Sequence, residues 1–229
     1  MSYFFKRFIS DREYPGIKLI VFDFDGTLAD TRELLLRIVK KHLFAFEISL
    51  TKDLLRFFGN TPLEHYISMT GIPKDLARSV CAGIHKDFIK EHHKIKPCKN
   101  FLTVKNINVR KVIVSNNLTF FIEKSLNFLN GNFFDGIYGA DKFENKVSMI
   151  NKLRRKYKLS ASEIVYIGDK DVDVDVARGA GVYSVIISNK SSWSSRKEIV
   201  RKKPDYVLTD LSKVSAVIGQ IDSEKLSAV

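Results

Sequence analysis

Continuous apolar runs recur along the chain, and stretches with helical periodicity separate them. The runs occupy residues 18–23, 110–115, 136–140, 163–168 and 182–188, with a shorter one at 206–208. They are rich in Val and Ile, which is typical of strands buried on both faces of a parallel sheet. Helices between such strands indicate right-handed crossovers. The pattern predicts an α/β protein with a Rossmann-like, doubly wound parallel sheet, in which 206–208 adds an edge strand.

The interval between the first and the second run carries mostly helical signals. An amphipathic pattern begins at Asp30 and Glu33 and places Phe46 near its apolar face. Residues 61–64, Thr-Pro-Leu-Glu, combine an N-cap, a first-turn proline and a capping-box glutamate. This combination predicts a short helix that ends at Gly71.

A longer helical pattern follows from Pro73 to about His93. We therefore expect residues 29–96 to form a helical cap that is inserted into the core. The core would then be discontinuous and comprise residues 1–28 and 97–229.

Composition narrows the class of protein. The chain has 229 residues, 45% of them apolar, which suffices for a large hydrophobic core. No run approaches the ~18 apolar residues of a membrane span, and Lys6 and Arg7 interrupt the apolar N-terminus, which lacks a signal-peptide cleavage site. Cys81 and Cys98 have no spacing for a zinc site, and no disulfide framework is expected. We expect a soluble cytoplasmic protein with no membrane partner.

The formal net charge of +12 would suit an anionic partner. Its densest parts, 152–158 and 196–203, are interpreted as solvated faces. In the first, Leu153 and Tyr157 lie four apart among the charges, as on a helix, and the second lacks interleaved aromatic residues. We therefore do not expect nucleic acid to be the partner. The sequence leaves the oligomeric state open.

Two carboxylates follow the first predicted strand. Asp23 and Asp25 are two residues apart, so strand geometry points them the same way, and Gly26 then lets the backbone turn. Ligand sites of open parallel sheets lie at the carboxyl ends of strands. Because ionised carboxylates repel, the pair implies a bound cation or a shared proton. The alternative is a turn in which Asp and Gly merely end a strand.

A second carboxylate cluster follows the strand at 163–168. Asp169 and Asp173 are four apart and would share a helix face. The helix dipole alone could favour acidic residues there. Taken with the first cluster, however, they give an oxygen-rich site of the kind that binds hard cations such as Mg²⁺.

These motifs together resemble the signatures of haloacid dehalogenase-like hydrolases. Residues 23–28, Asp-Phe-Asp-Gly-Thr-Leu, resemble the first signature. Ser115 and Lys146 resemble the second and third, and Gly168-Asp169-x-x-x-Asp173 resembles the fourth. Residues 174–181 are similar to the stretch that follows in the phosphoglycolate phosphatase-like branch. The four motifs occur in the family's order, and the resemblance covers nearly the whole chain.

The resemblance implies a role for each residue. Asp23 would attack phosphorus and form an aspartyl-phosphate, and Asp25 would act as general acid and then as general base. Ser115, Asn116 and Lys146 would hold the phosphoryl oxygens, with the backbone N–H groups of Phe24 and Asn116 completing the cradle.

The resemblance also implies a metal site. Mg²⁺ would bind the Asp23 side chain, the Asp25 backbone carbonyl and Asp169, with Asp173 as a ligand or a support for one. All five histidines fall within the predicted cap without metal-ligand spacing, so they are expected on solvated faces: His42, His65, His85, His92 and His93.

Some assignments keep an alternative. Lys146 precedes Val147 where the family usually has proline, so Lys142 is a rival for the same role. Ser115 could instead be a turn residue. In related phosphatases a glycine-containing cap loop reads the substrate, which makes Arg56 and Asn60 specificity candidates, with ordinary helix capping as the alternative.

The expected function is hydrolysis of a small phosphorylated metabolite, with phosphoglycolate suggested by the resemblance. A haloacid dehalogenase would not need an acid two residues after its nucleophile, so Asp25 argues against that activity. A phosphomutase of the same fold and a non-catalytic binding module remain as alternatives.

Overall fold

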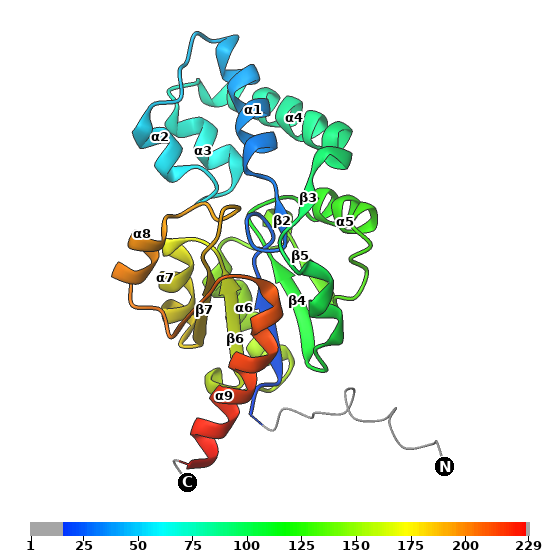
Figure 1. The fold of residues 1–229 in the computed structure, drawn as a ribbon. Helices are drawn as coiled ribbons and strands as arrows, with labels where there is room; N and C mark the ends of the chain where they lie inside the picture. The colour runs from blue at the N-terminus through cyan, green and yellow to red at the C-terminus, as the bar shows by residue number, and fades with distance from the viewer. Residues whose placement is uncertain (1–15, 228–229) are drawn as a thin grey trace.

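The computed structural model describes residues 16–227. The prediction that the apolar N-terminus is not a signal peptide concerns residues outside this range. A parallel sheet forms the centre of the molecule (Figure 1). Its strand order is β5-β4-β1-β6-β7-β8, and every pairing is parallel. The strands are β1 Leu19–Phe22, β4 Arg110–Val114, β5 Gly136–Tyr138, β6 Ile164–Gly168, β7 Tyr183–Ile187 and β8 Tyr206–Leu208. All six predicted strands, including the edge strand, are confirmed.

Strand β1 lies in the middle of the sheet because all four of its side chains are apolar and buried. Ile20 and Phe22 join the larger core cluster, whereas Leu19 and Val21 join a second cluster, so successive side chains enter different layers. Helices α5 (Thr119–Phe128) and α9 (Val214–Ser227) contribute to the first cluster.

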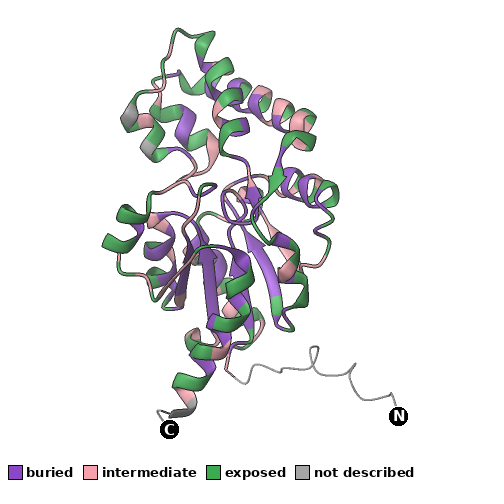
Figure 2. Ribbon diagram, viewed as in Figure 1, coloured by how far each residue is buried: buried purple, intermediate pink, exposed green. Residues whose placement is uncertain are grey.

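The helices on the other side complete the layered fold. Helices α6 (Lys146–Lys156) and α7 (Asp171–Ala180) contribute to the second cluster, and α8 (Arg196–Arg201) packs on a smaller one. Figure 2 shows the central strands largely buried and the helices exposed on their outer faces, whereas β5 and β8 are half-buried. The predicted doubly wound α/β fold is therefore confirmed.

Four helices follow β1 before the chain returns to the sheet: α1 Arg32–Phe44, α2 Lys52–Phe57, α3 Leu63–Met69 and α4 Lys74–Glu91. They lie together at one end of the molecule and connect to the rest through β2 (Ala29–Asp30) and β3 (Lys96–Pro97), which pair antiparallel (Figure 1). The division into a cap at 29–96 and a core stays a prediction. We use the word cap for these four helices.

Short 3₁₀ helices complete the fold: η1 His92–Lys94, η2 Phe101–Asn106, η3 Ala140–Lys142, η4 Ala161–Glu163 and η5 Leu211–Lys213. Within the described residues, no helix combines the length and the apolar composition needed to cross a membrane.

Several helix boundaries differ from the sequence prediction. Asp30 belongs to β2, and α1 begins after Thr31. Helix α1 ends at Phe44, so Phe46 lies beyond its apolar face and is 38% exposed. Pro62, not Thr61, is the N-cap of α3. Helix α2 was not predicted, although the Thr51 hydroxyl caps it by accepting a bond from the Leu54 N–H at 3.2 Å.

Candidate active site

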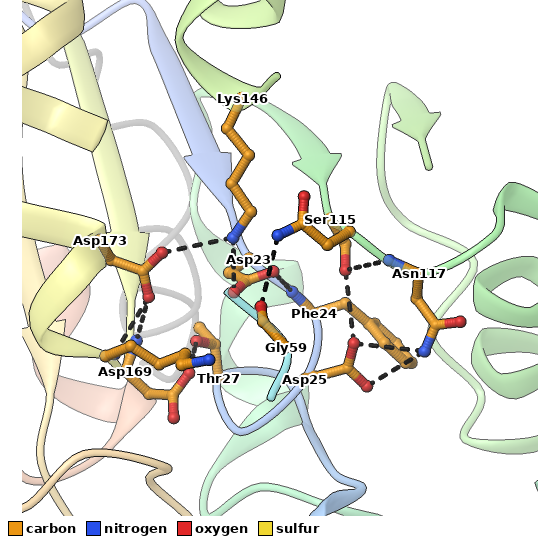
Figure 3. Close-up of polar contacts among 12 residues, drawn as sticks. Asp23, Phe24, Asp25, Thr27, Gly59, Ser115, Asn117, Lys146, Asp169 and Asp173 are labelled. Carbon is orange, nitrogen blue, oxygen red and sulfur yellow. Dashed lines mark hydrogen bonds and ion pairs between the residues drawn. The ribbon is translucent and has the colours of Figure 1, made fainter. Parts of the chain in front are cut away.

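The carboxyl ends of three adjacent strands bring the chemical residues together. Phe22, the last residue of β1, is in register with Ile113 of β4 and Ile167 of β6. The chain therefore leaves these strands at one edge of the sheet, where Asp23, Ser115 and Asp169 converge with the cap loop at Gly59 (Figure 3).

Asp23 lies at the centre of this site and is 4% exposed. One carboxylate oxygen accepts the Phe24 backbone N–H at 2.7 Å. The other lies 2.8 Å from the Lys146 ammonium (Figure 3). Burial raises the pKa of Asp23, and the neighbouring Lys146 opposes that rise. The two contacts fix the orientation of the carboxylate.

Asp25 has a different environment from Asp23. It accepts hydrogen bonds from the Thr31 hydroxyl at 2.7 Å and from the Asn117 amide at 3.3 Å. Burial, and then the negative charge of Asp23, raise the pKa of Asp25 to about 6. Its carboxyl group can therefore carry a proton far more readily than an ordinary aspartate, as a general acid requires.

Lys146 begins α6 and is 7% exposed. Its ammonium contacts Asp23 at 2.8 Å, Asp173 at 3.3 Å and the Tyr166 hydroxyl at 2.9 Å. Burial opposes its charge, but Asp173 and Asp23 outweigh burial and raise the pKa of Lys146. The rival Lys142 lies at the surface and pairs with its neighbour Asp141 at 3.3 Å. The structure thus brings Lys146, and not Lys142, to the carboxylates.

Three buried carboxylates form a cluster that fits a divalent cation. Ligand oxygens of Asp23, Asp169 and Asp173 lie within 4.8 Å of one another. Asp169 also accepts the Trp193 backbone N–H at 2.6 Å and the Thr27 hydroxyl at 3.2 Å. Burial, and then the charges of Asp173 and Asp23, raise the pKa of Asp169 well above its usual value. Such a concentration of buried oxygen ligands is the donor set that Mg²⁺ prefers.

Asp173 is engaged on both of its oxygens. One accepts the backbone N–H groups of Asp169 and Lys170, and the other accepts the Tyr166 hydroxyl at 2.9 Å. Burial works against its ionisation, but Lys146 and the Lys170 N–H outweigh burial and lower the pKa of Asp173. These contacts suit a carboxylate that orients the Asp169 loop and Lys146.

Gly26 provides the close approach between the two metal-binding loops. Its φ of 78° lies in the left-handed region. A Cβ at this position would overlap the Asp169 carboxylate and the Trp193 ring. The turn that was expected after Asp25 is therefore present, and it requires glycine.

Ser115 is buried and lies within 3.4 Å of the Asp25 carboxylate. Its hydroxyl oxygen accepts the Asn117 N–H at 3.3 Å. The Asn116 side chain turns toward the cap and donates to the Gly59 carbonyl at 3.3 Å. A phosphate contact by Asn116 would therefore come from its backbone, and this role stays a prediction.

The cap loop at Phe58 and Gly59 closes directly over the core. Lys170 donates to the Phe58 carbonyl at 2.8 Å, and the Phe58 and Trp193 ring centroids are 5.3 Å apart. Asn60 lines a groove beside this contact. The Arg56 side chain lies outside the described part of the structure, so its specificity role stays a prediction.

A small cavity of about 40 Å³ lies between the cap and the core. Asn116, Asn117 and Trp193 line it from the core, and Tyr66 and His85 line it from the cap. Burial lowers the pKa of His85. The expectation that every histidine occupies a solvated face is therefore wrong for His85, because the side of α4 that carries it faces the cavity between the cap and the core.

The sequence analysis missed several residues that support the site. Thr31 and Asn117 hold Asp25, and Thr27 holds Asp169. Their positions beside the motifs could have suggested them. Lys170 occupies a position within the fourth motif that the motif leaves open. Trp193 had no comparable signal, because its role depends on how the β7–α8 loop folds back onto Gly26.

Comparisons with known proteins agree with this geometry. The family model described as haloacid dehalogenase-like hydrolase matches residues 20–187. A protein of Caldanaerobacter subterraneus that carries a pyrophosphatase name is 25% identical, over 91% of this chain and 98% of its own. A phosphoglycolate phosphatase of Pseudomonas savastanoi is 24% identical, over 91% of this chain and 82% of its own.

A solved structure described as a haloacid dehalogenase-like hydrolase, from Bacteroides fragilis, superposes with a TM-score of 0.75. It is 25% identical, over 86% of this chain and 99% of that one. The prediction of this family and the prediction of a hydrolase are thereby confirmed. The chain is an enzyme that belongs to the haloacid dehalogenase-like hydrolase family.

Proposed function

We propose that the protein is a Mg²⁺-dependent phosphatase that forms an aspartyl-phosphate on Asp23. The observation that carries this proposal is the contrast between two neighbouring carboxyl groups. Burial raises the pKa of both groups, but Asp23 lies against the Lys146 ammonium and accepts the Phe24 N–H. Asp25 instead accepts hydrogen bonds from the neutral Thr31 and Asn117 side chains, and burial and then Asp23 raise its pKa to about 6. One group is thus arranged as a nucleophile and the other as a proton donor.

In the first step a carboxylate oxygen of Asp23 attacks phosphorus, and the bond from phosphorus to the leaving oxygen breaks. Asp25 transfers its proton to that oxygen, so the leaving oxygen departs as a neutral hydroxyl group. In the second step Asp25 takes a proton from water, and the water oxygen attacks the phosphorus of the aspartyl-phosphate. The bond between phosphorus and the Asp23 oxygen breaks, inorganic phosphate leaves, and both carboxyl groups return to their initial states.

Two other residues act on the phosphoryl oxygens. The Lys146 ammonium lies against Asp23, where it would neutralise charge on the transferring group. The Ser115 hydroxyl lies beside Asp25 and would donate to a further phosphoryl oxygen. Hydrogen bonds from Thr31 and Asn117 hold Asp25 in place while its proton moves.

The metal would be held by the carboxylates of Asp23 and Asp169 and by the backbone carbonyl of Asp25, with Asp173 beside them. When bound, Mg²⁺ supplies the positive charge that brings a dianionic phosphate to a carboxylate nucleophile. The high pKa of Asp169, which follows from burial and from Asp173 and Asp23, supports a cation at this position.

The substrate would be a small phosphate monoester, and the partner a phosphorylated metabolite. Phosphoglycolate is the first candidate, because relatives that match this chain are named phosphoglycolate phosphatases. Pyrophosphate is a second compound to test, on the name of another relative. Action in the cytoplasm belongs to the same proposal.

The test measures phosphate release from a panel of phosphate compounds that includes both of these, with Mg²⁺ and with excess EDTA. Asp23→Asn removes the nucleophile, and Lys152→Met, on an exposed side of α6, is the control. We expect Mg²⁺-dependent release that Asp23→Asn abolishes, and a hydroxylamine-sensitive phosphoprotein in the wild type and in Lys152→Met but not in Asp23→Asn.

The alternatives give different results. Transfer of the phosphoryl group to a second position of the substrate, with no inorganic phosphate, would indicate a phosphomutase. A folded protein that binds Mg²⁺ and turns over no compound would contradict the phosphatase proposal and favour a binding module.

A further inference from the structure

Lys170 is a buried lysine whose ammonium contacts a carbonyl oxygen and not a carboxylate, although the charges of Asp169 and Asp173 oppose the lowering of its pKa by burial. It is 6% exposed, and its ammonium donates to the Phe58 carbonyl oxygen at 2.8 Å. Within the described part of the chain, no carboxylate forms an ion pair with it. Lys146, by contrast, lies within 3.3 Å of two carboxylates. Buried charges are normally paired, so an ammonium with donors to spare suggests an anionic ligand.

Lys170 lies close to the residues expected to hold the phosphate. It follows Asp169 directly, and a Cβ on Gly59 would lie 3.2 Å from its ammonium nitrogen. The carbonyl of the same Gly59 accepts the Asn116 side chain at 3.3 Å. Gly59 therefore lies between Lys170 and the loop that follows β4, in contact distance of both. A group attached to a phosphate bound at that loop would have Lys170 as a near neighbour.

Trp193 connects Lys170 with the interior of the site. The Lys170 ammonium lies 5.0 Å from the Trp193 ring centroid. Phe58 and Trp193 line both the cavity of about 40 Å³ and an outer groove of about 1160 Å³, which Lys170 also lines. The two rings therefore stand between the two spaces, with Lys170 beside them.

Unpaired polar atoms lie at the same closure. The indole N–H of Trp193 and the hydroxyl of Tyr66 are buried without a hydrogen-bond partner within the described residues. Tyr66 is fully buried and lines the small cavity. Both atoms can donate, and a donor buried without an acceptor is costly. A substrate with an acceptor beyond its phosphate would satisfy them.

The outer groove carries an excess of positive charge, the same sign as that of Lys170. Its cationic residues outnumber its carboxylates. The cationic residues are Arg32, Lys170, Lys190, Arg196 and Lys202, and the acidic residues are Asp53, Asp171 and Glu198. Lys170 is the buried member of this set and directly follows Asp169. An anion that approaches through the groove would reach Lys170 last.

We propose that Lys170 is a specificity-determining residue whose ammonium binds a second anionic group on the leaving side of the substrate. The enzyme would therefore select phosphate compounds that carry a carboxylate or a further phosphate a few bonds from the phosphorus under attack. This inference rests on the proposed phosphatase function. The competing role for Lys170 is a clasp, in which it only ties the cap loop to the core through the Phe58 carbonyl.

The test compares two esters of similar size, 2-phosphoglycolate and 2-hydroxyethyl phosphate, which differ in the charge of the leaving group. Pyrophosphate forms a third arm that distinguishes a phosphate from a carboxylate. The variants are Lys170→Met, which keeps an unbranched chain against Trp193, and Lys170→Arg, which keeps the charge. Lys152→Met is the control, and kcat and KM are measured separately.

We expect Lys170→Met to reduce the preference in kcat/KM for an anionic leaving group by about ten- to a hundred-fold, as for the loss of a charge-assisted hydrogen bond. Lys170→Arg should keep most of that preference. If Lys170→Met lowers kcat/KM equally for the charged and neutral esters, Lys170 is only a clasp and the inference is wrong. A wild type without any preference would also contradict it.

A binding measurement separates this inference from the phosphatase proposal. Calorimetry with Mg²⁺ and the full chain carrying Asp25→Asn, which keeps Asp23 and the backbone carbonyl of residue 25, gives the affinity for each ester while turnover is slowed. Tighter binding of phosphoglycolate that Lys170→Met removes would support the role of Lys170 even if no compound is hydrolysed. If Asp25→Asn binds the charged and the neutral ester equally, with and without Lys170→Met, the inference is wrong, whatever the activity.

Discussion

Replacing Lys146 by methionine tests the centre of the site, and Lys142→Met is its matched control. The Lys146 ammonium contacts Asp23, Asp173 and the Tyr166 hydroxyl at 2.8, 3.3 and 2.9 Å. Lys142 lies four residues earlier and pairs with Asp141 at the surface. Methionine has a similar length and no charge. The comparison therefore removes the same group from a buried and from an exposed position.

The structure gives the expected size of each effect. Removing one partner of a buried ion pair costs about 3–5 kcal/mol, because the remaining charge stays buried. For a chain of this length that corresponds to a fall in Tm of roughly 6–20 °C. Loss of a donor to the transferring phosphoryl group should lower kcat by about 10²–10³-fold. Lys142→Met should change stability by less than ~0.5 kcal/mol, as an exposed pair does.

The assays are thermal unfolding with and without Mg²⁺, and phosphate release from the best substrate. Added Mg²⁺ should recover part of the stability lost in Lys146→Met, because a divalent cation would pair with the buried carboxylate charges that Lys146 no longer neutralises. It should not affect the difference between Lys142→Met and the wild type. Wild-type kcat in Lys146→Met, or equal losses in both variants, would refute the reasoning.

Three further substitutions test other contacts. Asp25→Asn should reduce kcat by about 10²–10⁴-fold while the protein still binds Mg²⁺, since only the proton donor is lost; turnover near the wild-type level would contradict its role. Glu91 accepts hydrogen bonds from Arg37 and Lys94, which lower its pKa from 4.5 to about 2. Its contribution is therefore complete above pH 4.5 and is lost as the pH falls toward 2. Urea unfolding should show Glu91→Gln less stable by up to ~1 kcal/mol at pH 7, with a difference that narrows below pH 4.5; a constant difference would argue against the ion pair. Gly26→Ala should lower Mg²⁺ affinity and activity, because its Cβ would overlap Asp169 and Trp193; unchanged Mg²⁺ titration would show that the loop can adjust.

Much of the sheet follows from local sequence. The strand runs are apolar because the central strands are buried on both faces, and this constraint is visible in any short window. Parallel pairing then brings the residues after β1, β4 and β6 to one edge, so Asp23, Ser115 and Asp169 could be placed together. Lys146 was harder, since α6 reaches the site only through its first residue.

The errors and omissions arise where contacts are distant in sequence. The amphipathic pattern continued to Phe46, but Glu47 adopts a φ of 58° and the chain leaves the helix first. His85 is a polar residue on α4, and the local sequence does not distinguish a face of this helix that meets solvent from a face that meets the core. Trp193 acts through contacts with Gly26 and Phe58, which only the folded loop creates.

The closed contact between cap and core limits how a substrate can reach Asp23. Asp23 is only 4% exposed, and the cap loop at Phe58 and Gly59 contacts the core beside it. The cap must therefore move before a phosphate ester can reach the carboxylate. The contacts that must separate include Lys170 with the Phe58 carbonyl and Asn116 with the Gly59 carbonyl. Each is a hydrogen bond of modest net strength, about 0.5–3 kcal/mol, so opening is thermally accessible. An anionic substrate would then offer Lys170 a stronger acceptor than the Phe58 carbonyl, which would couple closure to the charge of the leaving group.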